Sequence, residues 1–599
     1  EMTRRNLELV DPLRPGQEEA TLISVLDETL TPMGARTLRK WLLRPLLGLE
    51  RILERQAGIK ELYERRDLRV GFRRALAQIN DLERLAARLG STRMNPRDLL
   101  VLNSSFKKLP QIRENGTLLQ SNILCRLIEN VDLMEDLVEL IEISIDVDTP
   151  TKLSDGQVIR EGYSKELDEL RRVRNEAKSL IANLQASERE RTGINSLKVG
   201  FNKVFGYYLE VTKSNLSKVP EDYVRKQTLA NAERYFTPEL KEWEERVFVA
   251  EESIMDLELD IYKIVRSTVE LEVERIQRTA QQLARLDVLN ALAHVATRQG
   301  YVLPEINEDF MLEIEGGRHP VVEAMMSEGS FIPNDIELNQ SARIIILTGP
   351  NMAGKSTVLR QIGLITLMAH MGSYVPAKSA KVPLVDRIFT RVGASDNLAQ
   401  AQSTFMLEMT ETASIIRNAT NRSLVLLDEI GRGTSTYDGV SIAWAVTEYI
   451  HEKIGSKTIF ATHYHELTEL SQLLDAVKNM TMEIREIGEE IIFLRLLKEG
   501  ASDRSYGIHV ARLAGLPSEV IGRSQELLKK MEENVSGPDL DDHMGIEAEL
   551  SKPVPNDTES GIDEFCEALI SLDLDTMTPR EALNWLFEIR QNLRMDKEN

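Results

Sequence analysis

The chain has few of the features that mark secreted or membrane proteins. It contains only two cysteines, Cys125 and Cys566. Two thiols cannot form a disulfide framework, and their scarcity suits a reducing compartment. No apolar run approaches the roughly 18 residues of a membrane span, and the first residues lack the apolar core of a signal peptide. The sequence therefore predicts a cytoplasmic protein without a membrane partner, with several domains along its 599 residues.

The chain also lacks an excess of positive charge. Its formal net charge is −22, which taken alone disfavours a polyanionic ligand. The distribution is uneven, however. Residues 532–564 hold eleven Asp/Glu against one Lys (−10), whereas residues 191–226 hold seven Lys/Arg against three Asp/Glu (+4). Because local fields govern contact with a polyanion, the total charge does not exclude DNA.

Residues 349–357 fit the phosphate-loop pattern G-x-x-x-x-G-K-[ST]. An apolar stretch typical of a strand, 343–348, precedes them, and a helical apolar pattern, 358–369, follows. Between a strand and a helix, backbone N–H groups and the helix end attract phosphate oxygens. This context disfavours the alternative of a chance glycine turn. The pattern predicts ATP as ligand and assigns contacts to Gly349, Pro350, Asn351, Met352, Ala353, Gly354, Lys355, Ser356 and Thr357.

The chemistry expected of this loop needs a cation and a positioned water. Lys355 is expected to reach the β- and γ-phosphates, and the Ser356 hydroxyl to hold Mg²⁺. A second apolar strand ends in Asp428, expected to hold Mg²⁺ through water, and Glu429, expected to orient and deprotonate the attacking water. A third strand delivers His463, predicted as a γ-phosphate sensor. A lone histidine is more often structural, but this one follows a strand end as the two carboxylates do.

Composition divides the chain into parts. Residues 1–185 read as a helical core and first lever, with helices starting at Thr31-Pro32 and Asn95-Pro96. Residues 186–248 read as a small β-rich insert, 249–300 as one returning helix, and 301–531 as an α/β nucleotide unit. Two lever helices carrying a tip are expected; an ordinary helical bundle is the alternative. A coiled-coil seam is expected along Ile254, Leu257, Ile261, Ile264, Thr268 and Leu271.

The carboxyl-terminal region is expected to contain two further parts. The acidic residues 532–564 read as a disordered linker. In the tail, residues 565–599, a capping box at 578–581 precedes a helix with one apolar face. That helix is predicted to pair with another copy of the chain, giving a dimer or a tetramer. The alternative is that it folds back onto its own ATPase domain.

The chain closely resembles the MutS family of bacterial DNA mismatch-repair ATPases in four blocks that occur in this order: 349–357, 403–413, 427–439 and 461–467. The insert resembles that family's clamp in 197–203, 206–208 and 227–235, and 26–36 with 42–45 resemble its core. The resemblance implies an ATPase fold like that of ABC transporters, active as a dimer with nucleotide between subunits. It further implies that Ser403 contacts the γ-phosphate held by the partner and that Phe331 stacks on adenine. For Phe331 the alternative is a core residue of an edge strand.

The resemblance also implies a DNA clamp. Five residues are expected to grip the duplex backbone without reading its sequence: Lys198, Asn202, Lys203, Arg225 and Lys226. For each of them the alternative is an ordinary solvent-exposed residue. The expected partners are duplex DNA, a second copy of the chain and downstream repair proteins. A DNA partner implies that the protein is nucleoid-associated.

The chain departs from the family pattern at its start. No Phe-x-Glu, the family's mismatch-reading wedge, precedes the core, and Glu1 opens the chain without Met. A fragment lacking the mismatch-recognition and connector domains is therefore expected, with poor mismatch discrimination. A lesser departure is residues 400–402, where the family often has glycine. The expected function is an ATP-dependent DNA-binding component of mismatch repair; the alternatives are a related recombination factor that embraces branched DNA, or an ABC-type ATPase that never touches DNA.

Overall fold

The computed structural model describes residues 1–535 except 14, 15, 18, 92, 203, 205, 328, 351, 393–403, 488, 489 and 502–505. The chain divides into two compact units, 1–510 and 511–599. The predictions for Lys203, Asn351, Ser403 and the tail lie outside the described residues, as does the acidic linker beyond residue 535. None of the described helices combines the length and apolar character that a bilayer span requires.

The first part of unit 1 is helical, and local capping explains where its helices begin. The Thr31 hydroxyl accepts from Gly34 N–H, and Asn95 forms a capping box with Asp98. The helix starts predicted at Pro32 and Pro96 are therefore confirmed. The helices are α1 (Met2–Asn6), α2 (Leu22–Leu26), α3 (Pro32–Leu43), α4 (Leu49–Glu64), α5 (Arg66–Leu76), α6 (Leu82–Gly90), α7 (Pro96–Phe106), α8 (Leu109–Gly116), α9 (Asn122–Glu129) and α10 (Glu135–Ser144).

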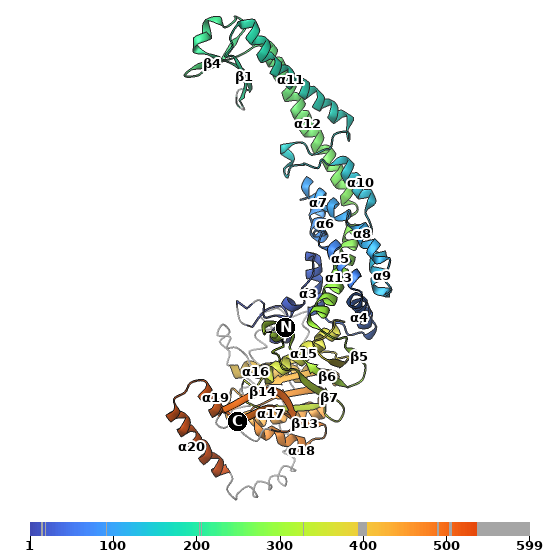
Figure 1. Cartoon of the computed structure of the whole chain (residues 1–599), viewed down its shortest axis with the longest axis vertical. Helices are drawn as coiled ribbons and strands as arrows, with labels where there is room; N and C mark the ends of the chain where they lie inside the picture. Colours follow the sequence, from blue (N-terminus) through green and yellow to red (C-terminus); the bar gives the residue numbers. More distant parts are fainter. Residues whose placement is uncertain are drawn as a thin grey trace, which may run out of the picture. The chain divides into compact units, whose positions relative to one another are not determined.

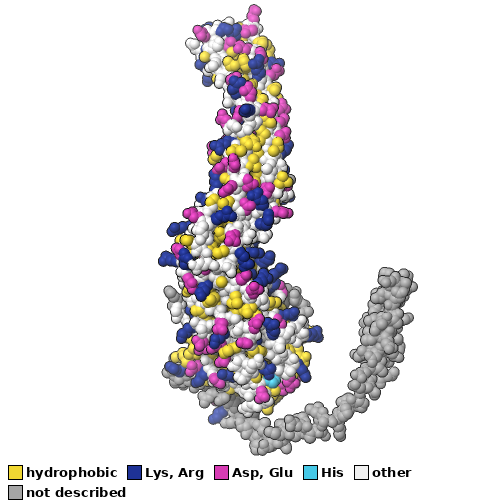
Figure 2. Space-filling view, turned by 90° about the vertical axis from the view of Figure 1, so that its right-hand side faces the viewer, with side chains coloured by type: hydrophobic (Ala, Val, Ile, Leu, Met, Phe, Trp, Pro, Cys, Tyr) yellow, Lys and Arg dark blue, Asp and Glu magenta, His cyan; other side chains and the backbone are white. Residues whose placement is uncertain are grey.

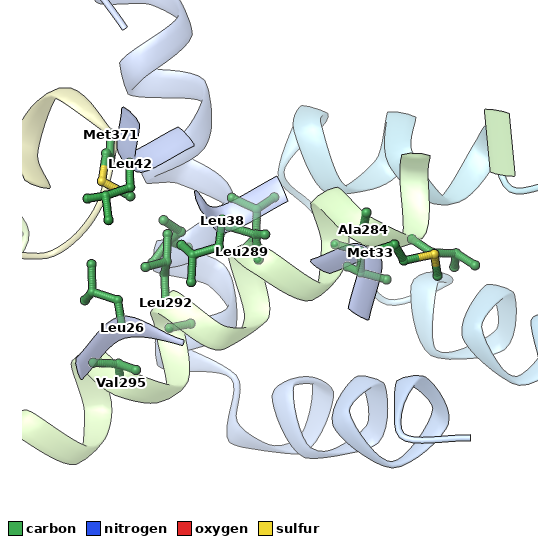
Figure 3. Packing of buried hydrophobic residues seen from close by; sticks show 14 of the residues in the cluster. Leu26, Met33, Leu38, Leu42, Ala284, Leu289, Leu292, Val295 and Met371 are labelled. Atoms are coloured by element: carbon green, nitrogen blue, oxygen red, sulfur yellow. The ribbon is translucent and has the colours of Figure 1, made fainter. Parts of the chain in front are cut away.

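Helix α13 (Val273–Gln299) is the buried spine of this part and packs against α3, α4, α5 and α6. Figure 3 shows side chains of α2 and α3, among them Leu26, Leu38 and Leu42, meeting Leu289 and Leu292 of α13. Such interdigitated aliphatic side chains contribute most of the stabilisation of a helical core.

One buried charge fixes the start of α3 on this spine. Asp287 of α13 accepts hydrogen bonds from the N–H groups of Leu30 and Thr31 and from the Thr31 hydroxyl, at 3.1, 2.8 and 2.6 Å. Burial raises the pKa of Asp287, and the three donors oppose that shift.

Two arms lead to a small β-rich tip. Helices α11 (Lys165–Thr192) and α12 (Pro238–Glu270) lie side by side and bracket β1 (Lys198–Asn202), β2 (Gly206–Thr212), β3 (Val224–Thr228) and β4 (Ala232–Phe236) (Figure 1). The strands form an antiparallel sheet of order β1-β2-β4-β3. The tip has its own hydrophobic core, which includes Leu209, Val211 and Tyr235 together with Leu184 and Val247 of the arms.

The return from the tip differs from the single long helix that the sequence predicts. Helix α12 ends at Glu270 and α13 begins at Val273. The predicted coiled-coil seam is wrong beyond Ile261, since Ile264 and Leu271 are 63% and 83% exposed. The buried stripe instead continues through Tyr262, Val265 and Val269. An α-helix turns every 3.6 residues, so a strict 3.5-residue repeat drifts off the contact face within a few turns.

The α/β part holds the predicted nucleotide unit. Its main sheet has the order β10-β11-β12-β8-β13-β14, parallel except for β14, and a second sheet has the order β5-β9-β6-β7. All residues of β8, β11 and β12 are buried, which is typical of parallel strands covered on both faces. The three strands that the sequence predicts are confirmed. The strands are β5 (Glu305–Asn307), β6 (Leu312–Gly317), β7 (Asn334–Leu338), β8 (Ile344–Thr348), β9 (Ser379–Pro383), β10 (Ile388–Arg391), β11 (Leu424–Asp428), β12 (Lys457–Ala461), β13 (Val477–Ile487) and β14 (Glu490–Glu499).

Helices cover this sheet and supply the loops at its edge. Those of unit 1 are α14 (Pro320–Met325), α15 (Lys355–His370), α16 (Thr404–Asn418), α17 (Thr436–Tyr449) and α18 (Leu470–Leu473). Helix α19 (Gly507–Leu513) spans the boundary between the units, and α20 (Ser518–Val535) belongs to the second unit. Because α20 runs to Val535, the first residues of the predicted linker belong to a helix.

Candidate nucleotide site

The phosphate loop joins β8 to α15 by a turn that requires unusual backbone angles. Gly349 and Gly354 have φ angles of 133° and 102°, and Met352 has 72°. A Cβ atom at Gly349 would lie 3.1 Å from the Cβ of Met482 on β13, so both space and backbone angle favour glycine there. The turn delivers the amino end of α15 directly after the loop. The first N–H groups of a helix of this length attract anions.

Lys355, the first residue of α15, is buried with its ammonium group inside the loop. Its Nζ donates to the carbonyl oxygens of Gly349 at 2.5 Å and Pro350 at 3.4 Å, and lies 3.4 Å from Nε2 of His463. Burial lowers the Lys355 pKa to about 8, although the nearby Glu429 carboxylate opposes the shift. The ammonium group is therefore held by two carbonyl oxygens, and a phosphate oxygen would be a stronger hydrogen-bond partner for it.

Asp428 ends β11 beside the loop and is 3% exposed. Burial raises its pKa, and a hydrogen bond with the Ser356 side chain opposes that shift. Its other oxygen, Oδ1, is buried without a hydrogen-bond partner among the described residues. An unpartnered buried carboxylate oxygen is costly unless a cation satisfies it. Asp428 and Ser356 thus fit Mg²⁺, which commonly takes only one or two protein oxygens next to phosphates.

Glu429 follows Asp428 and adopts a left-handed backbone with φ 56°. Its Oε1 lies 2.5 Å from Nε2 of His463, and its Oε2 lies 2.5 Å from a guanidinium nitrogen of Arg432. The hydrogen bond from His463, aided by the charges of His463, Arg432 and Lys355, lowers the Glu429 pKa to about 2. A non-glycine residue held at positive φ is strained, and such strain clusters at functional sites.

The structure therefore brings together four predicted residues from three strand ends: Lys355, Asp428, Glu429 and His463. Arg432 belongs to the same group through its contact with Glu429, although no pattern in the sequence distinguishes it from the other residues of its motif. Its link to Glu429 became visible only with the loop in place.

A buried ion pair behind β11 was also missed. Glu408 of α16 accepts from the backbone N–H of Gly431 and from Arg391, whose guanidinium nitrogen lies 3.1 Å from it. Arg391 also donates to the Asp428 carbonyl at 3.3 Å. Both side chains are 5% exposed. The pair connects α16, which begins immediately after Ser403, with the loop that carries the two carboxylates.

Glycine is needed where this loop turns. Gly431 has φ 89°, and a Cβ atom there would lie 2.5 Å from the carbonyl oxygen of Gly439. The hydroxyl of Tyr464 donates to the Gly431 carbonyl at 2.8 Å. The loop after β11 is therefore packed backbone against backbone, which fixes Glu429 relative to His463.

Phe331 lines a hollow of about 230 Å³ beside the phosphate loop. It lies in the segment before β7, not in a strand, so the alternative of an edge-strand residue is wrong. The walls include Met352, Gly354 and Thr357 of the loop region. Sequence reasoning missed the remaining wall residues, among them Val322, Met326, Asn334, Met482 and Arg495.

The residues predicted to grip DNA lie on opposite edges of the tip sheet. Lys198 and Asn202 lie on β1, whereas Arg225 and Lys226 lie on β3, with β2 and β4 between. Lys198 and Arg225 are exposed. Carboxylates lie near two of the cations: Glu233 at 3.8 Å from Arg225, and Glu244 at 3.9 Å from Lys226. The structure does not gather these residues into one strip.

Comparison with known proteins places these features in a family. Residues 2–293 match the model of MutS domain III, residues 345–532 that of MutS domain V, and residues 562–592 that of the DNA mismatch repair protein MutS C-terminal region. The chain is 49% identical to the DNA mismatch repair protein MutS of Acetivibrio thermocellus over 99% of its own length and 69% of the relative's. The MutS of Symbiobacterium thermophilum is 49% identical (99% and 68%), and that of Halothermothrix orenii 47% (100% and 70%). With such similarity along its whole length, the chain belongs to the MutS family.

Proposed function

We propose that this chain is the ATP-hydrolysing and DNA-gripping portion of a DNA mismatch-repair protein. One observation carries the proposal: in a chain of the MutS family, Lys355, Asp428, Glu429 and His463 meet at the carboxyl edge of a parallel sheet. That edge is where open α/β sheets bind ligands. The ATPase is of the ABC type and works as a dimer.

Triphosphate binding follows from what holds Lys355. Its ammonium donates to two loop carbonyls, which are weaker partners than phosphate oxygens. When the β- and γ-phosphates enter the loop, Lys355 exchanges carbonyls for anions, and N–H groups of the loop and of α15 surround the same oxygens. The adenine enters the hollow beside Phe331, whose ring offers a stacking face.

Asp428 and Ser356 would hold Mg²⁺ beside those phosphates, because Asp428 Oδ1 is buried and has no other partner among the described residues. When bound, the ion neutralises charge that develops on the phosphate oxygens.

Glu429 orients the attacking water. A carboxylate with a pKa of about 2 accepts a proton poorly at neutral pH, so deprotonation of the water requires release from His463 and Arg432. His463 lies beside both Glu429 and Lys355, so phosphates that draw Lys355 away would change the positive charge that His463 faces. This placement suits a sensor that frees the carboxylate only after the triphosphate is in place.

The partner subunit completes each site. Ser403 immediately precedes α16, whose helix dipole favours an anion at that end. Closing two such sites brings two copies together, and the arms then alter how the tips hold duplex DNA. ATP can drive this movement only by binding one arrangement more tightly than the other. The tail region that matches the family's C-terminal model mediates further association of copies.

The decisive experiment measures ATP hydrolysis by the purified chain without DNA, with fully paired duplex and with mispaired duplex. We expect both duplexes to change the rate, with little difference between them. No response to any DNA, together with no salt-sensitive DNA binding, would favour a non-DNA ATPase. A response confined to branched DNA would favour a recombination factor.

A further inference from the structure

A large hollow in the helical part is distant in sequence from every residue of the nucleotide site. It has a volume of about 1290 Å³ and lies between α3, α4, α9 and α13. We call it the basic hollow and define it by its lining cations: Arg36, Lys40, Arg44, Arg51, Arg55, Arg126 and Arg285. Figure 2 shows Lys and Arg side chains gathered on the lower helical region of the face in view.

Most of the positive charge in the basic hollow is unbalanced. Arg36 is paired with Asp81 and Glu83, and Arg126 is paired with Glu54. The other five cations form no ion pair within the part of the chain that the structure describes, and four of them are exposed: Lys40, Arg44, Arg51 and Arg285. Like charges so close together repel one another, and an anion would relieve that repulsion.

The fifth cation forms a fixed wall. Arg55 is 9% exposed, its guanidinium carbon lies 3.5 Å from the centre of the Trp41 ring, and one nitrogen donates to the Met371 carbonyl at 3.1 Å. Burial, aided by the charges of Arg51 and Arg285, lowers the Arg55 pKa to about 9. The stacked pair is therefore a rigid element against which a ligand can pack without reorganisation.

The walls are not only cationic. Ile123, Leu127 and Leu289 line the basic hollow, and Leu47, also in the lining, is 61% exposed. Typical small-molecule sites enclose about 300–1,000 Å³, so this hollow suits a larger occupant. A duplex backbone offers phosphates without apolar side chains, and free phosphate would leave the exposed Leu47 uncovered. A peptide offers both kinds of group, because carboxylates pair with arginine forks while apolar side chains cover aliphatic walls.

We propose that the basic hollow binds an acidic segment of a partner protein, in which Asp and Glu flank an apolar side chain. Carboxylates of that segment pair with Arg51, Arg285 and their neighbours, and its apolar side chain covers the exposed Leu47 and the half-buried Ile123. The site lies apart from the residues proposed for ATP hydrolysis, so binding here does not depend on that function being correct.

The test uses the full chain and a short fluorescent peptide of leucines flanked by aspartate and glutamate. Fluorescence anisotropy would measure its affinity for the wild type, for the double variant Arg51→Glu with Arg285→Glu, and for Arg74→Glu. Arg74 is an exposed arginine of α5 outside the hollow and is the matched control. We expect the double variant to bind about tenfold or more weakly, because charge reversal puts like charges face to face, and Arg74→Glu to bind like the wild type.

Two further probes separate the possible ligands. Replacing the acidic residues of the peptide with glutamine should abolish binding, and so should replacing leucine with serine. Equal losses in the double variant and in Arg74→Glu would overturn the proposal, as would tight wild-type binding of the leucine-free peptide. Duplex DNA or inorganic phosphate binding that is lost in the double variant, while peptide binding stays intact, would make the hollow a phosphate site instead. Unchanged thermal unfolding of each variant ensures that losses reflect binding.

Discussion

Glu429 carries two partners that compete with its proposed role. Its carboxylate is held by His463 and Arg432 at 2.5 Å each, and its backbone adopts a left-handed angle. Those contacts keep the group ionised, and they also occupy both oxygens. In the proposed function, a rearrangement of His463 on the arrival of phosphate would free further acceptor capacity of Glu429 for the attacking water.

The first prediction concerns this carboxylate. Glu429→Ala should bind ATP with nearly wild-type affinity, while hydrolysis falls by roughly 100-fold or more, because the water loses its orienting partner. Steady-state hydrolysis and a separate nucleotide-binding titration would measure the two effects. Glu466→Ala removes an exposed carboxylate just beyond His463 and should leave hydrolysis unchanged. Wild-type turnover of Glu429→Ala would remove this residue from the mechanism.

The second prediction concerns the charge of Lys355. Its pKa is lowered to about 8, so the unliganded protein loses this charge as pH rises through that value. Bound phosphates favour the charged form, so ATP binding above about pH 8 should take up a proton, and ATP affinity should fall as pH rises further. Calorimetry in buffers of different ionisation enthalpy would detect the uptake. Lys355→Ala should bind no ATP at any pH, and a pH-independent wild-type affinity would contradict the prediction.

At the residue scale, the sequence can predict which groups lie near one another when they are neighbours along the chain. The loop that holds Lys355 and the strand end that holds Asp428 and Glu429 are each a short continuous motif. The partners of those residues come from distant positions: Arg391 and Glu408 meet only through the fold, and Phe331 shares its hollow with Arg495. No local pattern predicts such a meeting.

At the scale of elements, the buried pair between Arg391 and Glu408 connects α16 with the loop after β11. We predict that Glu408→Gln lowers stability by about 3 kcal/mol, since it leaves a buried guanidinium without its closer charge partner. It should also lower kcat for ATP with little change in KM, because the Gly431 loop loses an anchor. Thermal unfolding and initial-rate kinetics would measure both.

Glu411→Gln is the matched control, since Glu411 lies on the same helix 3.8 Å from Arg391. It should change both quantities much less, because Arg391 keeps its closer partner. If Glu408→Gln lost stability while kcat and KM stayed at wild-type values, the pair would be purely structural.

The tip sheet supports a prediction about DNA. Lys198→Ala and Arg225→Ala should each weaken binding to any duplex and lower the salt dependence, each by about one released counterion, because both exposed side chains are proposed to contact phosphates without reading bases. Binding titrations at several salt concentrations would measure the slope. Lys453→Ala, an exposed residue of the α/β part, should leave the slope unchanged. A loss limited to particular sequences would contradict backbone gripping.

Helix starts and buried strands could be predicted because their signals are local: Thr31 and Asn95 cap helices, and the strand of β11 is a continuous apolar run. The contact face of α12 could not. In the first turns of α12, the apolar residues fit a 3.5-residue and a 3.6-residue period equally well. Only packing against the partner helix decides which of the two periods the buried face follows further along. The break between Glu270 and Val273 likewise has no proline or glycine to signal it.

At the scale of the whole molecule, sharing of sites between copies can be tested by mixing. Ser403→Ala subunits combined with Lys355→Ala subunits should recover part of the ATP hydrolysis that either variant lacks alone, since one of the two composite sites then keeps both residues. Hydrolysis by a purified heterodimer would measure this recovery. A confirmed heterodimer with no recovery would contradict sharing.

The tip has a hydrophobic core separate from the cluster that joins the helical and α/β parts. Among the described residues, no buried apolar side chain belongs to both. Selection can therefore exchange the tip residues proposed to grip DNA, for example Lys198 or Arg225, without disturbing the packing of the part that holds the proposed nucleotide site. The tip and the part that holds the proposed nucleotide site can therefore evolve at different rates within one polypeptide.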